Sequence, residues 1–126
     1  MNQKLPDRET AVLDFEGLLE RCMGNLEFAE RILSKFQQRF GEELAELETE
    51  LERDNAEGIT RIAHRLNGES ANVAAERLQA SAAMIETLGR AERISEIPPC
   101  LEELRGEWSR FVDSLSSLSS SGGARR

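Results

Sequence analysis

Apolar residues recur every three or four positions along most of the chain, and charged residues fill the positions between them. The longest such run covers residues 25–54. Its large apolar side chains are separated by steps of four, four, four, four, three and four: Phe28, Ile32, Phe36, Phe40, Leu44, Leu47 and Leu51. Residues three and four apart lie on the same face of an α-helix, so this spacing predicts one continuous amphipathic helix.

The same periodicity predicts four further helices. The first is short and covers residues 13–23, with Asp14 as its N-cap and the pair Gly24 and Asn25 as its stop signal. The other three are expected over residues 56–72, 74–93 and 99–118. Two prolines, at 98 and 99, suit the opening turn of the last helix because proline is tolerated there but not in a helix interior.

The arrangement of these helices predicts the fold class. No stretch of the sequence alternates apolar and polar residues as a strand would. Amphipathic helices joined by short turns favour an all-α fold, an antiparallel up-down four-helix bundle with a short additional N-terminal helix. We expect a flexible N-terminus over residues 1–11, the bundle over 12–118 and a disordered Ser/Gly tail over 119–126.

Composition narrows the range of functions. A length of 126 residues suits one domain, and a net charge of -8 disfavours nucleic-acid binding. There is no apolar run of membrane-spanning length and no secretory signal, so we expect no membrane association and a cytoplasmic location. The two cysteines, Cys22 and Cys100, lie far apart in sequence and are expected to be reduced thiols.

The single histidine, His64, is expected on the outside of the third predicted helix, which covers residues 56–72. On a helical wheel with about 100° per residue, Ile59, Ile62, Ala63 and Leu66 cluster within about a third of the circle. His64 falls on the opposite side. It is therefore predicted to be a surface residue rather than part of the core.

The residues around His64 suit a phosphoryl acceptor. Gly68 and Ala71 lie along the helix from the imidazole and leave its edge uncovered, although Gly68 costs the helix about 0.8–1 kcal/mol relative to alanine. Arg61 and Arg65 provide guanidinium donors for phosphate oxygens, and Asn67 adds a neutral polar group. A neutral imidazole is a nucleophile near pH 7. The alternative is an ordinary surface histidine, with Gly68 serving helix packing and both arginines simply solvated.

The segment ITRIAHRLNGESANVAAERLQ, residues 59–79, resembles the signature of histidine-containing phosphotransfer (HPt) domains. In that signature Ala-His-x-Leu-Lys-Gly is followed by Ser and then by Gly-Ala-x-x-Leu. The matching positions here are Ala63, His64, Leu66, Gly68, Ser70, Ala75 and Leu78. The upstream stretch LDFEGLLERCMGNLEFAERILSKF is similar to the opening of such domains, so the resemblance covers about residues 12–90.

The sequence departs from this family pattern at two places. Asn67 stands where the family usually has a lysine that helps to neutralise phosphate, and Arg61 or Arg65 is a candidate substitute. Ala74 and Ala75 replace the Gly-Ala pair. We expect that replacement, which adds one methyl group, to alter only packing.

The resemblance implies a phosphorelay intermediate rather than a kinase. His64 would accept a phosphoryl group from an aspartyl phosphate of a response regulator receiver domain and pass it to another receiver. The implied partners are receiver domains and a hybrid histidine kinase, and the chain is expected to act as a monomer. The resemblance implies no cofactor on this chain, with Mg²⁺ held by the receiver. The sequence has no GxxxxGK[ST] loop for ATP.

The sequence is also compatible with other functions. The chain could be a helical adaptor that binds receiver or kinase domains without carrying phosphate. An enzyme with its own active site is a weaker alternative, because only one histidine and scattered carboxylates are present. No metal site is expected, since one histidine and two separated cysteines give no usable ligand spacing. A coiled-coil assembly through the long helix over residues 25–54 is another weak alternative, because the apolar stripe of that helix is needed to close the bundle.

Overall fold

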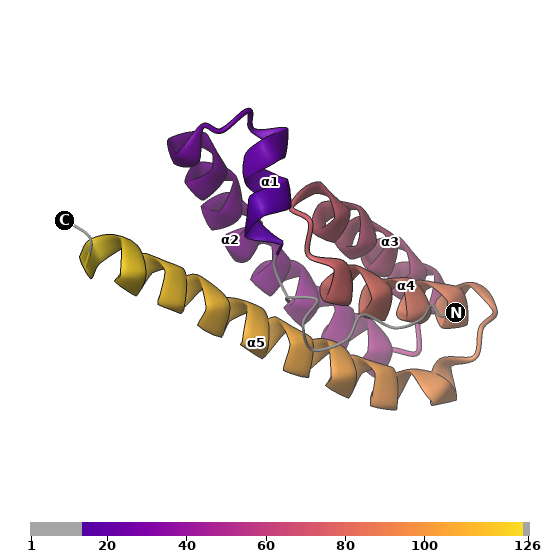
Figure 1. Ribbon diagram of the computed structural model, residues 1–126. Helices are drawn as coiled ribbons and strands as arrows, with labels where there is room; N and C mark the ends of the chain where they lie inside the picture. Colours follow the sequence, from indigo (N-terminus) through magenta and orange to yellow (C-terminus); the bar gives the residue numbers. More distant parts are fainter. Residues whose placement is uncertain (1–13, 125–126) are drawn as a thin grey trace, which may run out of the picture.

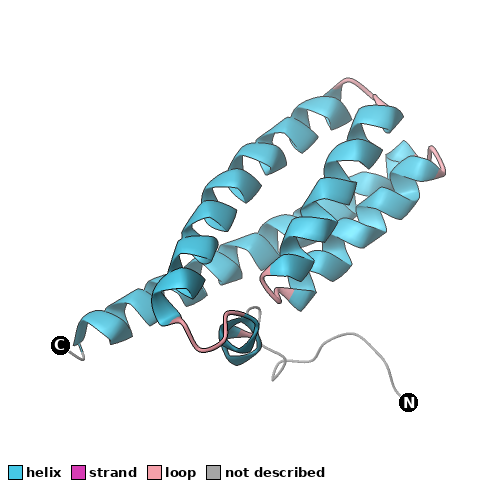
Figure 2. Ribbon diagram, turned by 90° about the horizontal axis from the view of Figure 1, so that it is seen from above, coloured by secondary structure: helices cyan, strands magenta, loops and turns pink. Residues whose placement is uncertain are grey.

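The computed structural model describes residues 14–124, and the side chains of residues 14–116. These residues form helices and no strand. Helices α2 to α5 lie side by side as a bundle, and the short α1 packs beside α2 (Figures 1 and 2). The elements are α1 (Phe15–Arg21), α2 (Leu26–Glu52), α3 (Ala56–Asn72), α4 (Glu76–Arg90), a 3-10 turn (Ile94–Glu96) and α5 (Ile97–Ala124). The predicted all-α bundle with a short additional N-terminal helix is confirmed.

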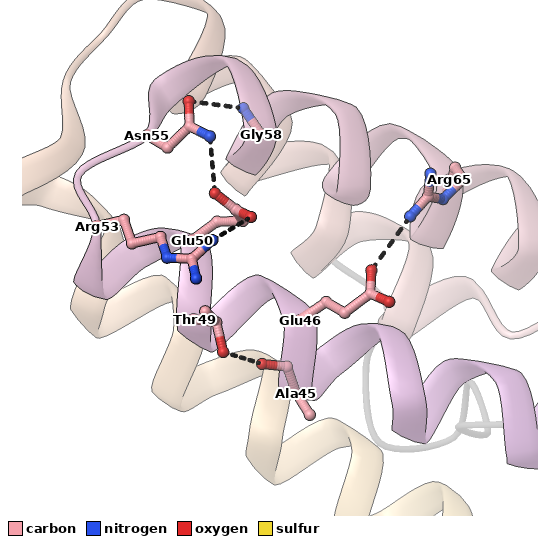
Figure 3. Close-up of polar contacts among 8 residues, drawn as sticks. All are labelled: Ala45, Glu46, Thr49, Glu50, Arg53, Asn55, Gly58 and Arg65. Carbon is pink, nitrogen blue, oxygen red and sulfur yellow. Dashed lines mark hydrogen bonds and ion pairs between the residues drawn. The ribbon is translucent and has the colours of Figure 1, made fainter.

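Side-chain caps explain why three of the helices begin where they do. The side chains of Asp14, Asn25 and Asn55 each accept a hydrogen bond from a backbone N–H three residues later, at the starts of α1, α2 and α3. These bonds satisfy donors that the first turn of a helix leaves free. The Asn55 cap is held in turn by a hydrogen bond from its amide to Glu50 (2.7 Å), so it also ties α3 to the end of α2 (Figure 3).

An aromatic cluster joins α2 to α5 in the core. Phe40 stacks on Trp108 with ring centroids 4.4 Å apart, and Phe36 meets Phe111 edge-on at 5.2 Å. Phe40 and Phe111 are fully buried. Gly41 faces Trp108, where an added Cβ would be 4.0 Å from the indole. These aromatic side chains of α2 and α5 therefore pack against each other inside the bundle.

The first part of α2 differs from the predicted stripe. Phe28 is 46% exposed and Ile32 is only partly buried, whereas Ala29 and Leu33 are buried. A step of four residues overshoots one helical turn by about 40°, so Phe28 is rotated by about 120° from Phe40. Ala29 and Leu33 differ from Phe40 by only about 20° and therefore share its face.

The last helix is longer than the sequence predicted. It begins at Ile97 and continues to Ala124, so residues 119–124 are helical where we expected the disordered Ser/Gly tail. Its final turns run beyond α2 at that end of the bundle (Figure 1). Extending an existing helix adds one hydrogen bond for each residue that is fixed, which offsets the poor helix propensity of serine and glycine. The expected flexible segment 1–11 and residues 125–126 lie outside the described residues.

Helices α3 and α4 pack closely because α4 has a glycine at the contact. A Cβ added at Gly89 would lie 2.6 Å from Thr60 Oγ1 and 3.3 Å from the Thr60 backbone nitrogen. A larger residue at this position would push the two helices apart. The close approach matters for the site below, because α3 carries His64.

Ala74, in the turn between α3 and α4, has a left-handed backbone with φ of 60°. The replacement of glycine by alanine here therefore does more than alter packing, because left-handed backbone costs a non-glycine residue about 1–2 kcal/mol. We expect Ala74→Gly to stabilise the protein by about 1 kcal/mol, measured by urea unfolding. The matched control is Ala80→Gly on the exposed face of α4, which should destabilise by about 1 kcal/mol. Equal destabilisation by both changes would contradict the assignment of strain at Ala74.

Candidate functional site

His64 stands in the middle of α3 with its side chain 70% exposed. Its neighbours Ile62, Ala63 and Leu66 are buried on the opposite side and fix the helix against the core. The prediction that His64 faces outward is confirmed. A helix anchored in this way presents the imidazole from a rigid element, which favours defined reaction geometry.

One carboxylate from the neighbouring helix holds the imidazole ring. Glu86 of α4 lies with Oε2 2.8 Å from His64 Nδ1, and the Glu86 side chain is only 8% exposed. The contact joins residues 22 positions apart in sequence. Sequence reasoning did not single out Glu86, although one signal was present: a charged residue four positions after the buried Ala82, on the apolar side of α4.

Glu86 is the centre of a small polar network. The Asn67 amide donates to Glu86 Oε1 at 3.3 Å, and Arg90 Nη2 donates to Oε2 at 2.9 Å. Burial raises the pKa of Glu86, but hydrogen bonds from His64 and Asn67, together with the charges of His64 and Arg90, outweigh it and lower the pKa below its ordinary value. Glu86 is therefore ionised at neutral pH.

The ionised carboxylate determines which imidazole nitrogen is available for chemistry. A carboxylate only accepts hydrogen bonds, so Nδ1 of His64 must carry the proton in the contact with Glu86. In the neutral ring the lone pair then lies on Nε2. With the side chain largely exposed, Nε2 is the nitrogen that an incoming electrophile can reach.

The space beside the imidazole is open, as the sequence predicted. Gly68 is exposed, and a Cβ built on it would meet nothing within 4 Å. Ala71, one turn further along, is partly buried, and its carbonyl accepts a hydrogen bond from Arg21 Nη1 of α1 at 2.7 Å. The alternative interpretation of Gly68, as a residue that lets two helices pack closely, is therefore wrong.

The structure separates the two predicted arginines. Arg65 turns toward α2, where its Nη2 lies 3.5 Å from Glu46 (Figure 3). Its Nε lies 3.3 Å from Glu43. It does not join the network around Glu86. Arg61 is exposed and lines a surface pocket between the start of α3 and the end of α4, together with Arg90. Arg90 was not singled out from the sequence, although its spacing of four residues from Glu86 is that of a helical ion pair.

Neither a metal site nor a membrane-spanning helix is found in the part of the chain that the structure describes. Among the described residues, no group of three or more histidine, cysteine, aspartate or glutamate side chains could hold a metal ion. Within the same part of the chain, none of the helices combines the length and apolar character that crossing a bilayer requires.

The chain is similar to known phosphotransfer proteins. The family model for the Hpt domain matches residues 31–116. The histidine-containing phosphotransfer protein MtHPt2 from Medicago truncatula has 23% sequence identity and a TM-score of 0.79, covering 89% of this chain and 80% of its own. The HPT domain of the Hpt sensor hybrid histidine kinase from Shewanella has 17% identity and a TM-score of 0.75, covering 87% of this chain and 95% of its own. A search of curated proteins found no significant match.

The two structural similarities show a shared helical fold, and the family model spans more than half of the chain. The resemblance inferred from the residues around His64 is thereby confirmed. This chain belongs to the Hpt domain family.

Proposed function

We propose that this chain is a phosphorelay intermediate in which His64 accepts a phosphoryl group from a receiver-domain aspartate and passes it to another receiver domain. Membership of the Hpt family supports a phosphotransfer role in two-component signalling. The observation that carries the assignment to His64 is its ring geometry. Nδ1 is 2.8 Å from an ionised carboxylate, and the remainder of the side chain is exposed to solvent.

In the proposed step, the Nε2 lone pair attacks phosphorus and forms the N–P bond. The bond from phosphorus to the aspartyl oxygen breaks, and the aspartate leaves as a free carboxylate. The Nδ1 proton stays in place, donated to Glu86, and the carboxylate balances the positive charge that develops on the ring. Transfer to the next receiver is the reverse of this sequence.

The positive charge near the phosphoryl group would come from residues other than the lysine that is usual in the family. Asn67 is neutral and its amide is used in orienting Glu86. Arg90 and Arg61 are exposed cations that line the same surface pocket between α3 and α4, and they are the candidates for contacts with phosphate oxygens. Arg65 would have to leave Glu43 and Glu46 to serve the same purpose.

Receiver domains of response regulators and a hybrid histidine kinase would exchange the phosphoryl group with this chain, which acts as a carrier rather than as a kinase. Mg²⁺ would be held by the receiver and not by this chain. Action as a monomer in the cytoplasm belongs to the same proposal.

The test is a transfer time course from phosphorylated receivers. The full chain is mixed with each member of a panel of receivers carrying a radiolabelled aspartyl phosphate, and the label on the chain is followed. We expect acid-labile, base-stable label, which is the behaviour of phosphohistidine, to appear as label leaves the receiver. Binding of a receiver without any transfer of label, across the panel, would instead establish the phosphate-free adaptor.

Gly68 provides a second test, because the open space beside it allows a larger side chain to obstruct a partner without disturbing the fold. Gly68→Gln replaces a glycine in a helix interior with a better helix former, so the free energy of unfolding should rise by about 0.5–1 kcal/mol. The same side chain should obstruct the approach to His64 and slow phosphoryl transfer by about tenfold or more. Gly68→Ala, which adds a single methyl group, should keep most of the transfer rate. If Gly68→Gln transfers at the wild-type rate, the open space is not the docking route.

A further inference from the structure

Two acidic residues, one buried and one partly buried, lie where α2 packs against α3, away from the Glu86 network. Glu43 of α2 is 9% exposed, and the side chain of Glu69 of α3 is 22% exposed. Oε1 of each residue is fully buried and has no hydrogen-bond partner among the described residues. Burying two acceptor oxygens without a donor is costly, so this arrangement needs an explanation.

The charged groups that face the pair come from the same two helices. Arg39 Nε of α2 lies 3.8 Å from Glu69 Oε2, and Arg65 Nε of α3 lies 3.3 Å from Glu43 Oε2. Arg65 also reaches Glu46, whose side chain is 59% exposed (Figure 3). Each arginine thus contacts an Oε2 atom and leaves the two Oε1 atoms without a donor.

A proton on one carboxyl group supplies the missing donor. Protonated Glu69 can donate an O–H to the neighbouring Glu43, and this hydrogen bond would supply a donor that the buried acceptors lack. Burial, then the hydrogen bond and the negative charge of Glu43, raise the pKa of Glu69 to about 7, against the opposing charges of Arg39 and Arg65. Glu69 therefore holds its proton into the neutral range.

We propose that Glu43 and Glu69 share one proton, and that the resulting hydrogen bond stabilises the packing of α2 against α3, the helix that carries His64. Loss of this proton above neutral pH weakens the α2–α3 contact. Deprotonation leaves two neighbouring carboxylates whose buried Oε1 atoms both lack a donor. The affected helix is the one on which His64 depends for its position, since Glu69 follows it by little more than one turn.

The direction of the pH effect follows from proton binding. Between the ordinary carboxyl pKa of 4.5 and the raised pKa of about 7, the folded state binds more protons than the unfolded state. The stability contribution of Glu69 is therefore fully present below pH 4.5 and is lost as the pH rises through about 7. Glu69→Gln keeps a donor in place and removes the ionisation, so the variant should not show this loss.

The experiment compares urea unfolding of the full chain at pH 5.5 and pH 8.5. The equilibrium constant for unfolding of wild type, divided by that of Glu69→Gln, should be about 30-fold larger at pH 8.5 than at pH 5.5. The matched control is Glu42→Gln, which removes the same charge from an exposed position of α2 and should leave the ratio almost unchanged. His64 contributes equally to all three proteins and drops out of the ratios. Equal pH responses of Glu69→Gln and Glu42→Gln would overturn the proposal.

A direct measurement keeps the proposal testable if Glu69→Gln does not fold. The side-chain carboxyl carbons of the wild-type glutamates are followed by ¹³C NMR from pH 4 to pH 9. One of them should titrate near pH 7, and this transition should move or disappear in Glu43→Gln. If every glutamate titrates below about pH 5, Glu43 and Glu69 share no proton and the proposed hydrogen bond between them does not exist.

Discussion

His64→Gln is expected to carry no acid-labile, base-stable label after incubation with any phosphorylated receiver. Glutamine has polar atoms that can still contact Glu86 but has no nucleophilic ring nitrogen. His64 is the only histidine of the chain, so no other imidazole can replace it. The loss should be complete, and it is measured by the same transfer time course that labels the wild-type protein.

The fold of His64→Gln should be preserved, so a loss of label can be assigned to the missing imidazole. The side chain is 70% exposed, so little packing is removed, and the free energy of unfolding should change by less than about 1 kcal/mol. Receiver binding should also be retained. Acid-labile, base-stable label on a folded His64→Gln protein would show that the phosphoryl group is carried elsewhere.

Glu86→Leu is expected to slow phosphoryl transfer to His64 by about 10- to 100-fold. Leucine keeps much of the buried volume but cannot accept the Nδ1 proton, so the ring loses both its orientation and the preference for a lone pair on Nε2. The rate is measured under single-turnover conditions with a phosphorylated receiver in excess. An unchanged rate in a folded variant would show that the contact with Glu86 has no part in transfer.

Glu86→Gln is the matched variant, because its amide oxygen can still accept from Nδ1 while the negative charge is removed. We expect a smaller decrease, about fivefold, since a hydrogen bond to a charged group is stronger than one between neutral groups. The ¹⁵N NMR spectrum of His64 gives an independent readout: the neutral ring should carry its proton on Nδ1 in wild type and in Glu86→Gln, and predominantly on Nε2 in Glu86→Leu.

The lowered pKa of Glu86 also predicts how the site responds to acid. A carboxyl whose folded-state pKa is depressed contributes stability above its ordinary pKa of 4.5, and this contribution is lost as the pH falls through the folded-state pKa. The network of Glu86 with His64, Asn67 and Arg90 should therefore persist through the neutral range, and its contribution should be lost only in acid.

The outward position of His64 could be predicted because it depends only on local periodicity. Ile59, Ile62 and Leu66 define the buried side of α3, and a regular helix then fixes the direction of every other residue. The same reasoning located Gly68 beside the imidazole. Residues of one helix are related by a known rotation, so no tertiary information was needed.

Glu86 could not be assigned from the sequence because its role depends on how two helices pack. Its contact with His64 requires the close approach of α3 and α4 at Gly89, which periodicity does not specify. The direction of Arg65 is a similar case. Its position next to His64 suggested phosphate contact, but its long side chain reaches glutamates of α2.

The strain at Ala74 was missed for a different reason. The sequence shows which residue replaces the family's glycine, but not the backbone angle at that position. An alanine is compatible with many turn conformations, and only the structure reveals the left-handed one.

The most direct test of the proposed relay is to identify the phosphorylated atom. Wild-type chain is phosphorylated by a receiver and examined at neutral to alkaline pH by mass spectrometry of its peptides and by ¹⁵N and ³¹P NMR. We predict a single phosphoryl group on Nε2 of His64, with the Nδ1 proton retained toward Glu86. A chain that stays unphosphorylated across the receiver panel, or that carries the group on Nδ1 or on another residue, would contradict the proposal.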